Sequence, residues 1–474
     1  MSTGLAALPM ELAQPIFDQL NDRAIYALRL VSRSLQKSTI HRFRKAFAHR
    51  TTDLSTNSLQ TLLSICDHRY LASAVQSLTI VATYYDTEFL REVLDTKHPY
   101  KEYAFGPVIS VGDPCSEAEL AETAANVDIL EQRKGDQVNA ARSGSDLVVL
   151  TAVLRKASNL RKVTLEAGMY RHPETRLAVS KARNLWPRVW EKATHVYLIT
   201  MLAIAQSRPA IEELHVYGGR WGCSVLGYDV HASVPLLKTR GIETALANLR
   251  ILSMNCTTRL LDAIRPCSGR TVSMHPPSSL TESDQQFVSS AVDNEMYSGP
   301  ARLLTLCPNL EELELIHYQV HCPSWCPHGG TLDYEAGYEK VFAQIAQAVQ
   351  LPRLLKCKLR GQAFSEYAII RFLKNSPLLK HLELRLVNLK GLGAWCNIFE
   401  QCRRLETLVL RQLYADQRLL YWTGESAGDE AHDLTVDHDQ LQRGIDYVLS
   451  QSEADMVWVT SYIEERRRGS HPAA

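Results

Sequence analysis

The sequence lacks an excess of charge of either sign, long apolar runs and a phosphate-binding glycine motif. Its 474 residues include 52 basic and 52 acidic side chains, so the formal net charge is zero. A chain-wide electrostatic attraction to nucleic acid or to an anionic membrane is therefore not expected. No apolar run reaches the ~18 residues that a membrane-spanning helix needs. No G-x-x-x-x-G-K-S/T stretch occurs, so nothing indicates nucleotide hydrolysis.

The N-terminus also lacks a basic segment followed by an apolar core, and we expect no secretory signal. The 11 cysteines are odd in number and irregularly spaced, which fits reduced thiols better than a disulfide framework. Hydrophobic residues make up 45% of the chain, enough for a sizeable core. We expect a protein of the cytoplasm or nucleus with no cofactor, no nucleic-acid partner and no membrane partner.

A helical pattern of apolar residues begins close to the N-terminus. The residues that recur every four positions are Leu8, Leu12, Ile16 and Leu20. They predict one face of a helix, and Pro9 suits its first position. A second helical pattern runs through Ile25, Leu28, Val31 and Leu35, and a third, more basic one occupies 40–47. The prediction is a module of three short helices.

The order and spacing of these residues resemble those of an F-box over about residues 5–47. The matching positions are Leu8-Pro9, Glu11-Leu12, Ile16, Leu20, Ile25, Leu28 and Val31-Ser32-Arg33. Two positions depart from the pattern: Pro15 falls inside the first helix, and Leu35 stands where a bulky aromatic residue is common. In its family this module docks on the Skp adaptor of cullin-RING ubiquitin ligases.

The resemblance implies a set of adaptor contacts in this chain, namely Leu8, Pro9, Leu12, Ile16, Leu20, Leu28 and Val31. F-box apolar residues divide between a small internal core and a face that the adaptor covers, and exposed apolar patches of that kind usually mark interaction sites. A second interpretation stays open, in which the same helices are only a cap on the large domain that follows.

A Leu-x-x-Leu-x-Leu pattern recurs eight times after residue 72. Its copies are Val75-Leu78-Ile80, Leu160-Val163-Leu165, Ile211-Leu214-Val216, Leu249-Leu252-Met254, Leu310-Leu313-Leu315, Leu354-Cys357-Leu359, Leu379-Leu382-Leu384 and Leu405-Leu408-Leu410. The alternation at the end of each copy predicts a strand with one buried face. Helical segments that end in Ser-Pro, Cys-Pro or Arg-Pro precede several copies.

Helix, turn and short strand in repetition are typical of leucine-rich repeats, and the body resembles the degenerate leucine-rich arrays that accompany many fungal F-boxes. The predicted fold class is α/β, with a three-helix F-box followed by an irregular solenoid. The predicted divisions are 1–50 for the module, 51–71 for a connecting helix or linker, 72–414 for the repeats, and 415–474 for a C-terminal cap and tail. Segments 108–146 and 265–286 are expected to be surface loops.

Two sequence segments resemble a catalytic site and a metal site. Gly424 to Gly428 matches G-x-S-x-G, so a serine hydrolase that uses Ser426 is a remote alternative. The stretch 317–328 contains His317, His321, Cys322, Cys326 and His328, residue types that bind zinc. Their spacing matches no standard finger, and we favour a proline-rich loop with incidental thiols.

We therefore expect a non-enzymatic substrate receptor of an SCF-type ubiquitin ligase. Its partners would be a Skp-type adaptor, through it a cullin, and a client protein bound by the solenoid. The alternative from another class is a leucine-rich scaffold outside ubiquitination. The identity of the client and the oligomeric state do not follow from the residues.

Overall fold

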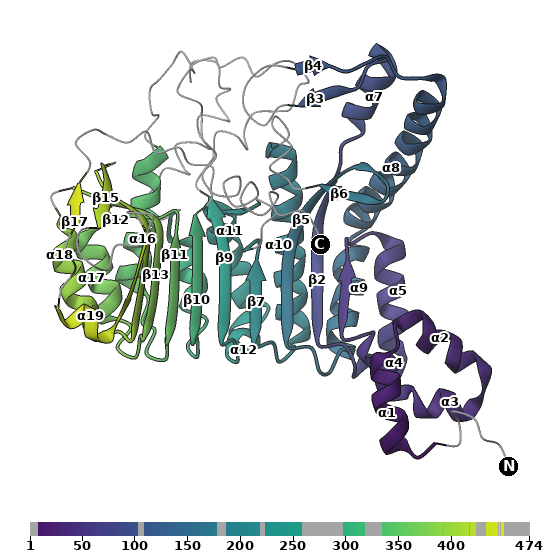
Figure 1. Cartoon of the computed structure of the whole chain (residues 1–474), viewed down its shortest axis with the longest axis horizontal. Coiled ribbons are helices and arrows are strands. Elements are labelled where there is room, and N and C mark those ends of the chain that lie inside the picture. Colours follow the sequence, from purple (N-terminus) through teal and green to yellow (C-terminus); the bar gives the residue numbers. More distant parts are fainter. Residues whose placement is uncertain are drawn as a thin grey trace.

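The computed structural model describes residues 8–102, 109–177, 186–218, 223–257, 297–317, 334–391, 393–416, 418–422, 433–443, 445 and 447–449. These residues form a mixed α/β structure built on one large, mostly parallel sheet, with a group of short helices at one end (Figure 1). The α/β class predicted from the sequence is confirmed. None of the helices in these ranges is both long and apolar enough to span a bilayer.

The helices are α1 (Met10–Gln19), α2 (Asp22–Val31), α3 (Arg33–Ser38), α4 (Ile40–Lys45), α5 (Thr56–Asp67), α6 (Arg69–Ala72), α7 (Thr87–Thr96), α8 (Glu117–Ser143), α9 (Ser145–Lys156), α10 (Trp186–Ser207), α11 (Gly227–Thr239), α12 (Ile242–Leu246), α15 (Gly299–Leu304), α16 (Tyr334–Ala348), α17 (Glu366–Lys374), α18 (Trp395–Cys402) and α19 (His438–Arg443). The strands are β1 (His49–Thr52), β2 (Ser77–Tyr85), β3 (Tyr100–Glu102), β4 (Ile109–Val111), β5 (Lys162–His172), β6 (Thr175–Leu177), β7 (Glu213–Val216), β8 (Val225–Leu226), β9 (Ile251–Thr257), β10 (Glu312–His317), β11 (Lys356–Arg360), β12 (Ala363–Ser365), β13 (His381–Lys390), β14 (Thr407–Ala415), β15 (Arg418–Trp422), β16 (Asp433–Asp437) and β17 (Tyr447–Leu449).

All eight repeat copies predicted from the sequence form strands of this sheet. They follow one another in chain order as β2, β5, β7, β9, β10, β11, β13 and β14, each parallel to the next. The middle residue of each motif is in register with that of its neighbour. This row is Leu78, Val163, Leu214, Leu252, Leu313, Cys357, Leu382 and Leu408. All of its members are at most 2% exposed, so the row is a continuous seam of the core.

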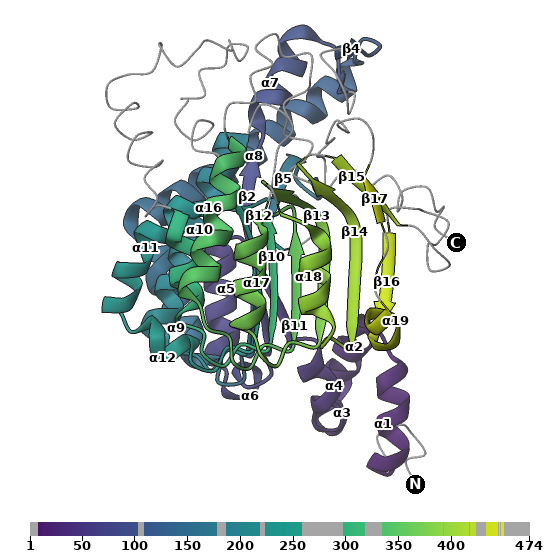
Figure 2. The ribbon, with the colours of Figure 1, turned by 90° about the vertical axis from the view of Figure 1, so that its left-hand side faces the viewer.

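The helices that connect successive strands gather on one face of the sheet, as the end-on view shows (Figure 2). Side chains alternate across a strand, so the leucines face these helices while the residues between them face the other side. In β13, for example, Leu382 and Leu384 are buried, whereas His381, Glu383 and Arg385 are half-buried. We call this second side the open face of the sheet.

Asparagine amides link successive units at the turns before the strands. Asn159 donates to the backbone oxygen of Ser73 at 2.7 Å, and Asn309 donates to that of Ala247 at 2.7 Å. The Asn375 side-chain amide donates to the backbone oxygens of Ala346 and Val349, at 2.9 and 3.0 Å. These asparagine side chains thus link three of the units to the preceding one.

Aromatic side chains fill the core near its C-terminal end. Ring centroids lie 4.8 Å apart for Phe342 and Phe364, 6.3 Å for Phe364 and Trp395, and 5.7 Å for Trp395 and Phe399. The chain of contacts continues to Trp422 at 6.1 Å. These large rings occupy the space between the sheet and the helices α16 to α18, where smaller side chains would leave cavities.

The N-terminal region contains four short helices rather than the three that the sequence predicts. The predicted second helix divides at Ser32, which is extended with φ −156° and ψ 154°. The Ser32 side chain accepts a hydrogen bond from the backbone of Leu35 and so begins α3. Serine favours such cap positions over helix interiors, because its hydroxyl competes for backbone groups.

Residues 51–71 hold the end of β1, the whole of α5 and most of α6. β1 pairs in parallel with β2, with Arg50 opposite Leu78. The buried residues of α5, among them Leu59 and Leu62, belong to the same core as the leucine seam. This segment is therefore part of the sheet domain in packing terms.

The segment 108–146, expected to be a surface loop, contains the long helix α8, and that expectation was wrong. Ser116 caps the helix reciprocally with Glu119: its hydroxyl accepts from the backbone of Glu119, whose carboxylate accepts from the backbone of Ser116. The Ser-x-x-Glu spacing is a helix-start signal in the sequence itself. Segment 265–286 lies outside the described residues.

The C-terminal side of the sheet ends in antiparallel strands. β16 pairs with β14, with Leu408 opposite Val436 and Leu410 opposite Leu434. An unpaired parallel edge would expose a row of backbone donors and acceptors, which β16 satisfies. The predicted cap region, 415–474, is described only in part, through β15, β16, α19 and β17.

Candidate functional site

The N-terminal helices pack around a small core that is separate from the core of the sheet. Its buried members are Ala13, Phe17, Ile25 and Leu35. Leu20, Leu28 and Phe43 are partly buried against them. Four short helices supply few apolar contacts, so the stability of this module is expected to be limited.

Local hydrogen bonds fix the helices of the module to one another. The Asn21 side chain accepts from the backbone of Ala24 at 2.9 Å and begins α2. Arg29 donates to the backbone oxygen of Gln36 at 2.7 Å, and its guanidinium lies 3.8 Å from the ring centroid of Phe43. The Arg29 side chain thus links α2 to α3 by a hydrogen bond and to α4 by a cation–π contact.

Five of the seven predicted adaptor contacts lie on the surface. Leu8 is 41% exposed, Leu12 60%, Ile16 41% and Val31 72%, and Pro9 is exposed as well. The other two, Leu20 and Leu28, are half-buried against the module's own core. The module therefore presents large apolar side chains to solvent, although the chain has a core available elsewhere.

Sequence reasoning missed further members of this surface. Leu30 is the most exposed large apolar residue of the module at 89%, and Met10, Tyr26 and Ile40 are exposed by 48%, 42% and 37%. Leu30 falls two residues after Leu28, outside the helical stripe that was counted. Because apolar residues occur on more than one side of α2, the sequence already indicated that some of them would be exposed. We call these residues, together with Leu8, Pro9, Leu12, Ile16 and Val31, the exposed apolar residues of the module.

The module is joined to the sheet domain through α4 and β1. Arg44 donates to the Ser73 hydroxyl at 3.0 Å, and the Ala48 backbone oxygen accepts from the backbone amides of Gln76 and Ser77, both at 2.9 Å. These contacts involve the end of α4 and the chain after it. Helix α1 itself lies away from the sheet (Figures 1 and 2).

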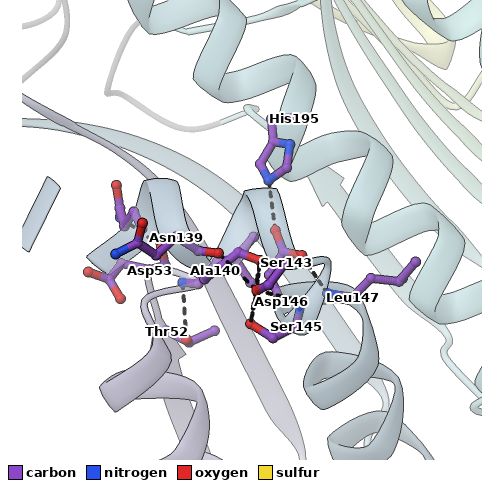
Figure 3. A network of polar contacts seen from close by, with 11 residues as sticks. Thr52, Asp53, Asn139, Ala140, Ser143, Ser145, Asp146, Leu147 and His195 are labelled. Atoms are coloured by element: carbon purple, nitrogen blue, oxygen red, sulfur yellow. Dashed lines mark hydrogen bonds and ion pairs between the residues drawn. The ribbon is translucent and has the colours of Figure 1, made fainter. Parts of the chain in front are cut away.

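A buried carboxylate and a partly exposed histidine form a polar pair between two helices of the body. Asp146 of α9, with a side chain 1% exposed, places Oδ2 2.8 Å from Nε2 of His195 on α10 (Figure 3). A carboxylate and an imidazole can serve a nucleophile in catalysis. Among the described residues, however, His195 has no recorded hydrogen bond to a hydroxyl or thiol. The pair links two helices.

The same region joins the α8–α9 corner to the start of the sheet. Gln137 donates to the backbone oxygen of Asp53 at 2.9 Å, and the Tyr85 hydroxyl donates to the Asp53 carboxylate at 3.1 Å. Ser143 and Ser145 share a hydrogen bond of 3.0 Å at the corner (Figure 3). These contacts support a structural role for the network.

Of the candidate zinc ligands in 317–328, only His317 lies within the described residues. It is 1% exposed and stands opposite Cys256 on the neighbouring strand. Burial lowers the pKa of His317 to about 3 and raises the pKa of the Cys256 thiol to about 12, so both are neutral at pH 7. Within the ranges that the structure describes, no three His, Cys, Asp or Glu residues gather as metal ligands.

The G-x-S-x-G motif with Ser426 also lies outside the described residues. The strand before it, β15, pairs antiparallel with β14 at the end of the sheet. His438, which follows the motif in the chain, has Nδ1 3.1 Å from the backbone oxygen of Leu405. Its ring thus contacts the turn before β14.

A shallow hollow of about 680 Å³ lies between α5, α6 and the end of α9. Cys66, Asp67, Tyr70 and Lys156 are among its lining residues, and Lys156 is paired with Asp67. Burial raises the pKa of Cys66 to about 11, which keeps this thiol protonated and weakly nucleophilic. Cys66 is thus not an activated nucleophile in this hollow.

Neither the comparison with models of known protein families nor the search of curated proteins found a match for this chain.

Proposed function

We propose that the chain is the substrate-receptor subunit of an SCF-type ubiquitin ligase, with an F-box that binds a Skp-type adaptor and a leucine-rich solenoid that binds a client protein. The observation that carries the proposal is the set of exposed apolar residues of the N-terminal module. Leu12 and Ile16 are exposed there although the module has a core of its own. Such exposed apolar residues favour a surface that a partner covers.

Two further features support the leucine-rich part of the proposal. The motif leucines form a continuous seam across parallel strands in chain order. The connecting helices lie on one face of the sheet, so these helices do not cover the open face (Figure 2). In this function the chain breaks no bonds itself; it raises the local concentration of the client at the ligase.

The test is co-purification of the full chain with a Skp-type adaptor. The informative variant is Leu12→Ala with Ile16→Ala, because both side chains are exposed and contribute little to the module's core. The matched control is Leu236→Ala with Leu378→Ala, two leucines of the sheet domain that are 47% and 55% exposed. Native chain and control are expected to retain the adaptor, and the Leu12/Ile16 variant to lose most of it.

Two results would overturn the proposal. One is failure of the folded native chain to retain the adaptor, and the other is an equal loss in both double variants. The first result would favour the other interpretation, a leucine-rich scaffold in which the N-terminal helices serve as a cap. The contacts of Arg44 and Ala48 with the sheet domain are compatible with that role.

A further inference from the structure

The turn that follows helix α9 carries an exposed serine behind two basic residues. The stretch is Arg155-Lys156-Ala157-Ser158, in which the arginine, the lysine and the serine are all exposed. Helix α9 ends at Lys156, so Ser158 lies in the turn before β5. The backbone amide of Ser158 donates to the oxygen of Lys156 at 2.9 Å, and its hydroxyl has no partner within the described residues. This hydroxyl is therefore accessible to an enzyme.

Basic residues three and two positions before a serine or threonine are the pattern that one class of protein kinases selects. Carboxylates in the substrate groove of such a kinase pair with the two cations and so place the hydroxyl at the bound nucleotide. Within the described ranges, the residues that follow an arginine by three positions are Ser32, Ser145, Ser158, Thr164, Ser253, Thr305 and Thr407. Of these seven, only Ser158 and Thr164 also follow a lysine by two positions.

The structure separates these two candidates, because Thr164 lies inside the sheet. It stands on β5, opposite Thr79 of β2 on one side and His215 of β7 on the other. A strand that is paired on both sides enters a kinase groove only if the sheet opens. Opening of core strands costs a large part of the global free energy of unfolding. Thr164 is therefore protected by the fold.

The segment around Ser158 can be extended at much lower cost. Arg155 and Lys156 belong to the last turn of α9, and the terminal turns of helices open readily. Among residues 155–159 only Ala157, a small side chain, is buried. One side-chain hydrogen bond holds this turn, from Asn159 to the backbone oxygen of Ser73 at 2.7 Å. A kinase thus has to displace few contacts to bind the segment.

Ser158 also lines the hollow between α5, α6 and the end of α9. The charged residues of this lining are Asp67, Arg69 and Lys156, and Lys156 is paired with Asp67. The side chain of Arg69 is exposed and has no partner within the described residues. A phosphoserine carries a charge of about −1.5 to −2 and is stabilised opposite arginine side chains. The hollow therefore offers a phosphate on Ser158 an available guanidinium.

We propose that Ser158 is a phosphorylation site for a kinase that recognises Arg155 and Lys156. In the transfer, Oγ of Ser158 forms a bond to the γ-phosphorus of ATP. The bond between that phosphorus and the oxygen that bridges it to the β-phosphorus breaks, and ADP leaves. The hydroxyl proton passes to a carboxylate of the kinase.

The site lies next to the connection between the N-terminal module and the sheet domain. Ser73 lines the same hollow as Ser158, and its hydroxyl accepts a hydrogen bond from Arg44 at 3.0 Å. A phosphate on Ser158 therefore adds negative charge at the end of the sheet domain where the module is attached. The inference goes beyond the proposed function and does not depend on it.

The experiment incubates the folded full chain with ATP and the catalytic subunit of cyclic-AMP-dependent protein kinase. Site-resolved mass spectrometry then gives the initial rate of phosphorylation at each position. A peptide of residues 152–161 is the reference substrate. Ser470, which follows two arginines outside the described residues, is counted separately. We expect phosphate on Ser158 in the peptide and in the full chain, none on Thr164, and no phosphate at position 158 in Ser158→Ala.

Arg155→Gln and Arg161→Gln form a matched pair of variants. Both arginines are exposed, one three residues before Ser158 and the other three residues after it, and each substitution removes one positive charge. Arg155→Gln is expected to lower the rate at Ser158 about tenfold, because one charge-assisted pair with the kinase is lost. Arg161→Gln should leave the rate within about twofold, since its pair with Glu212, at 3.3 Å, is exposed.

The proposal is overturned if the peptide is phosphorylated but Ser158 of the folded chain is not, because the turn then does not open. An unmodified peptide would overturn it as well, since the basic pair would not direct the kinase. Equal slowing in the two arginine variants would show that Arg155 is not recognised. Equal rates at Ser158 and Thr164 would show that the fold does not select the site.

Discussion

Leu12 and Phe17 lie five residues apart on the same ten-residue helix, yet Leu12 is 60% exposed and Phe17 is fully buried. One side chain thus belongs to the module's surface and the other to its core. Substituting each residue alone therefore tests the two roles separately: Leu12 for adaptor binding and Phe17 for folding of the module.

We expect Phe17→Ala to destabilise the N-terminal module by about 3–5 kcal/mol, the usual cost of removing a buried phenyl ring. Since the module has only a small core, this loss should unfold α1 to α4 locally while the sheet domain stays folded. Hydrogen exchange of the α1 and α2 amides would show faster exchange in this variant. Leu12→Ala should change the stability by no more than about 0.5 kcal/mol. Equal protection in both variants would contradict the assignment of Phe17 to the core.

Gly361 and Gly391 both have positive φ, at 66° and 82°, but their surroundings differ. A Cβ at Gly361 would lie 2.4 Å from the backbone oxygen of His317, whereas nothing lies within 4 Å of a Cβ at Gly391. Gly391→Ala should therefore cost only the backbone strain of about 1–2 kcal/mol. Gly361→Ala should cost clearly more, because a backbone segment must move. Thermal unfolding of the two variants compares them, and similar melting temperatures would contradict this prediction.

Replacing two helical glycines with alanine should change the stability of the protein in opposite directions. Gly135 is exposed within α8 and a Cβ there meets nothing within 4 Å, so Gly135→Ala should stabilise the helix by about 1 kcal/mol. A Cβ at Gly299 would lie 2.3 Å from the backbone oxygen of Gly227. Gly299→Ala should separate α11 from α15 and lower the melting temperature. Differential scanning calorimetry of both variants would refute the prediction if the two shifts had the same sign.

His317 should make stability depend on pH in the acidic range. Its pKa is about 3 in the folded chain because of burial, against about 6.5 for an unperturbed histidine. Between these values the unfolded chain binds the extra proton, so stability decreases as the pH falls below about 6.5 and is unaffected by this group above it. At about pH 5 the loss amounts to about 2 kcal/mol.

The comparison variant for that measurement is His317→Gln, which does not titrate. Urea unfolding at about pH 7.5 and about pH 5 gives the pH-dependent loss for each chain, and the loss should be smaller in the variant by about 2 kcal/mol. Other carboxylates and histidines contribute equally to both chains. An unchanged pH dependence would show that His317 is not held neutral by burial.

The strands were more predictable than the helices. The two-residue spacing between Leu313 and Leu315 recurs in all eight copies, and every copy forms a strand. An apolar residue at every second position is the pattern of a strand with one buried face. The N-terminal helices followed the pattern less closely. Helix α1 runs only from Met10 to Gln19, so of the four leucine and isoleucine positions only Leu12 and Ile16 lie on it, and both are exposed. Leu20 follows the helix in an extended conformation and packs against the module's core.

The sequence by itself determined the α/β class, the order of the buried strands and the presence of apolar residues beyond what a small helical module can bury. Those properties depend on local periodicity, which can be read from the spacing of apolar residues along the chain. Only the tertiary structure decided which apolar side chains are exposed and how Ser158 and Thr164 differ. Both follow an Arg-x-x or Arg-Lys-x stretch of the same residue types. Only the pairing of β5 with β2 and β7, segments far from it along the chain, encloses Thr164 and leaves Ser158 in an exposed turn.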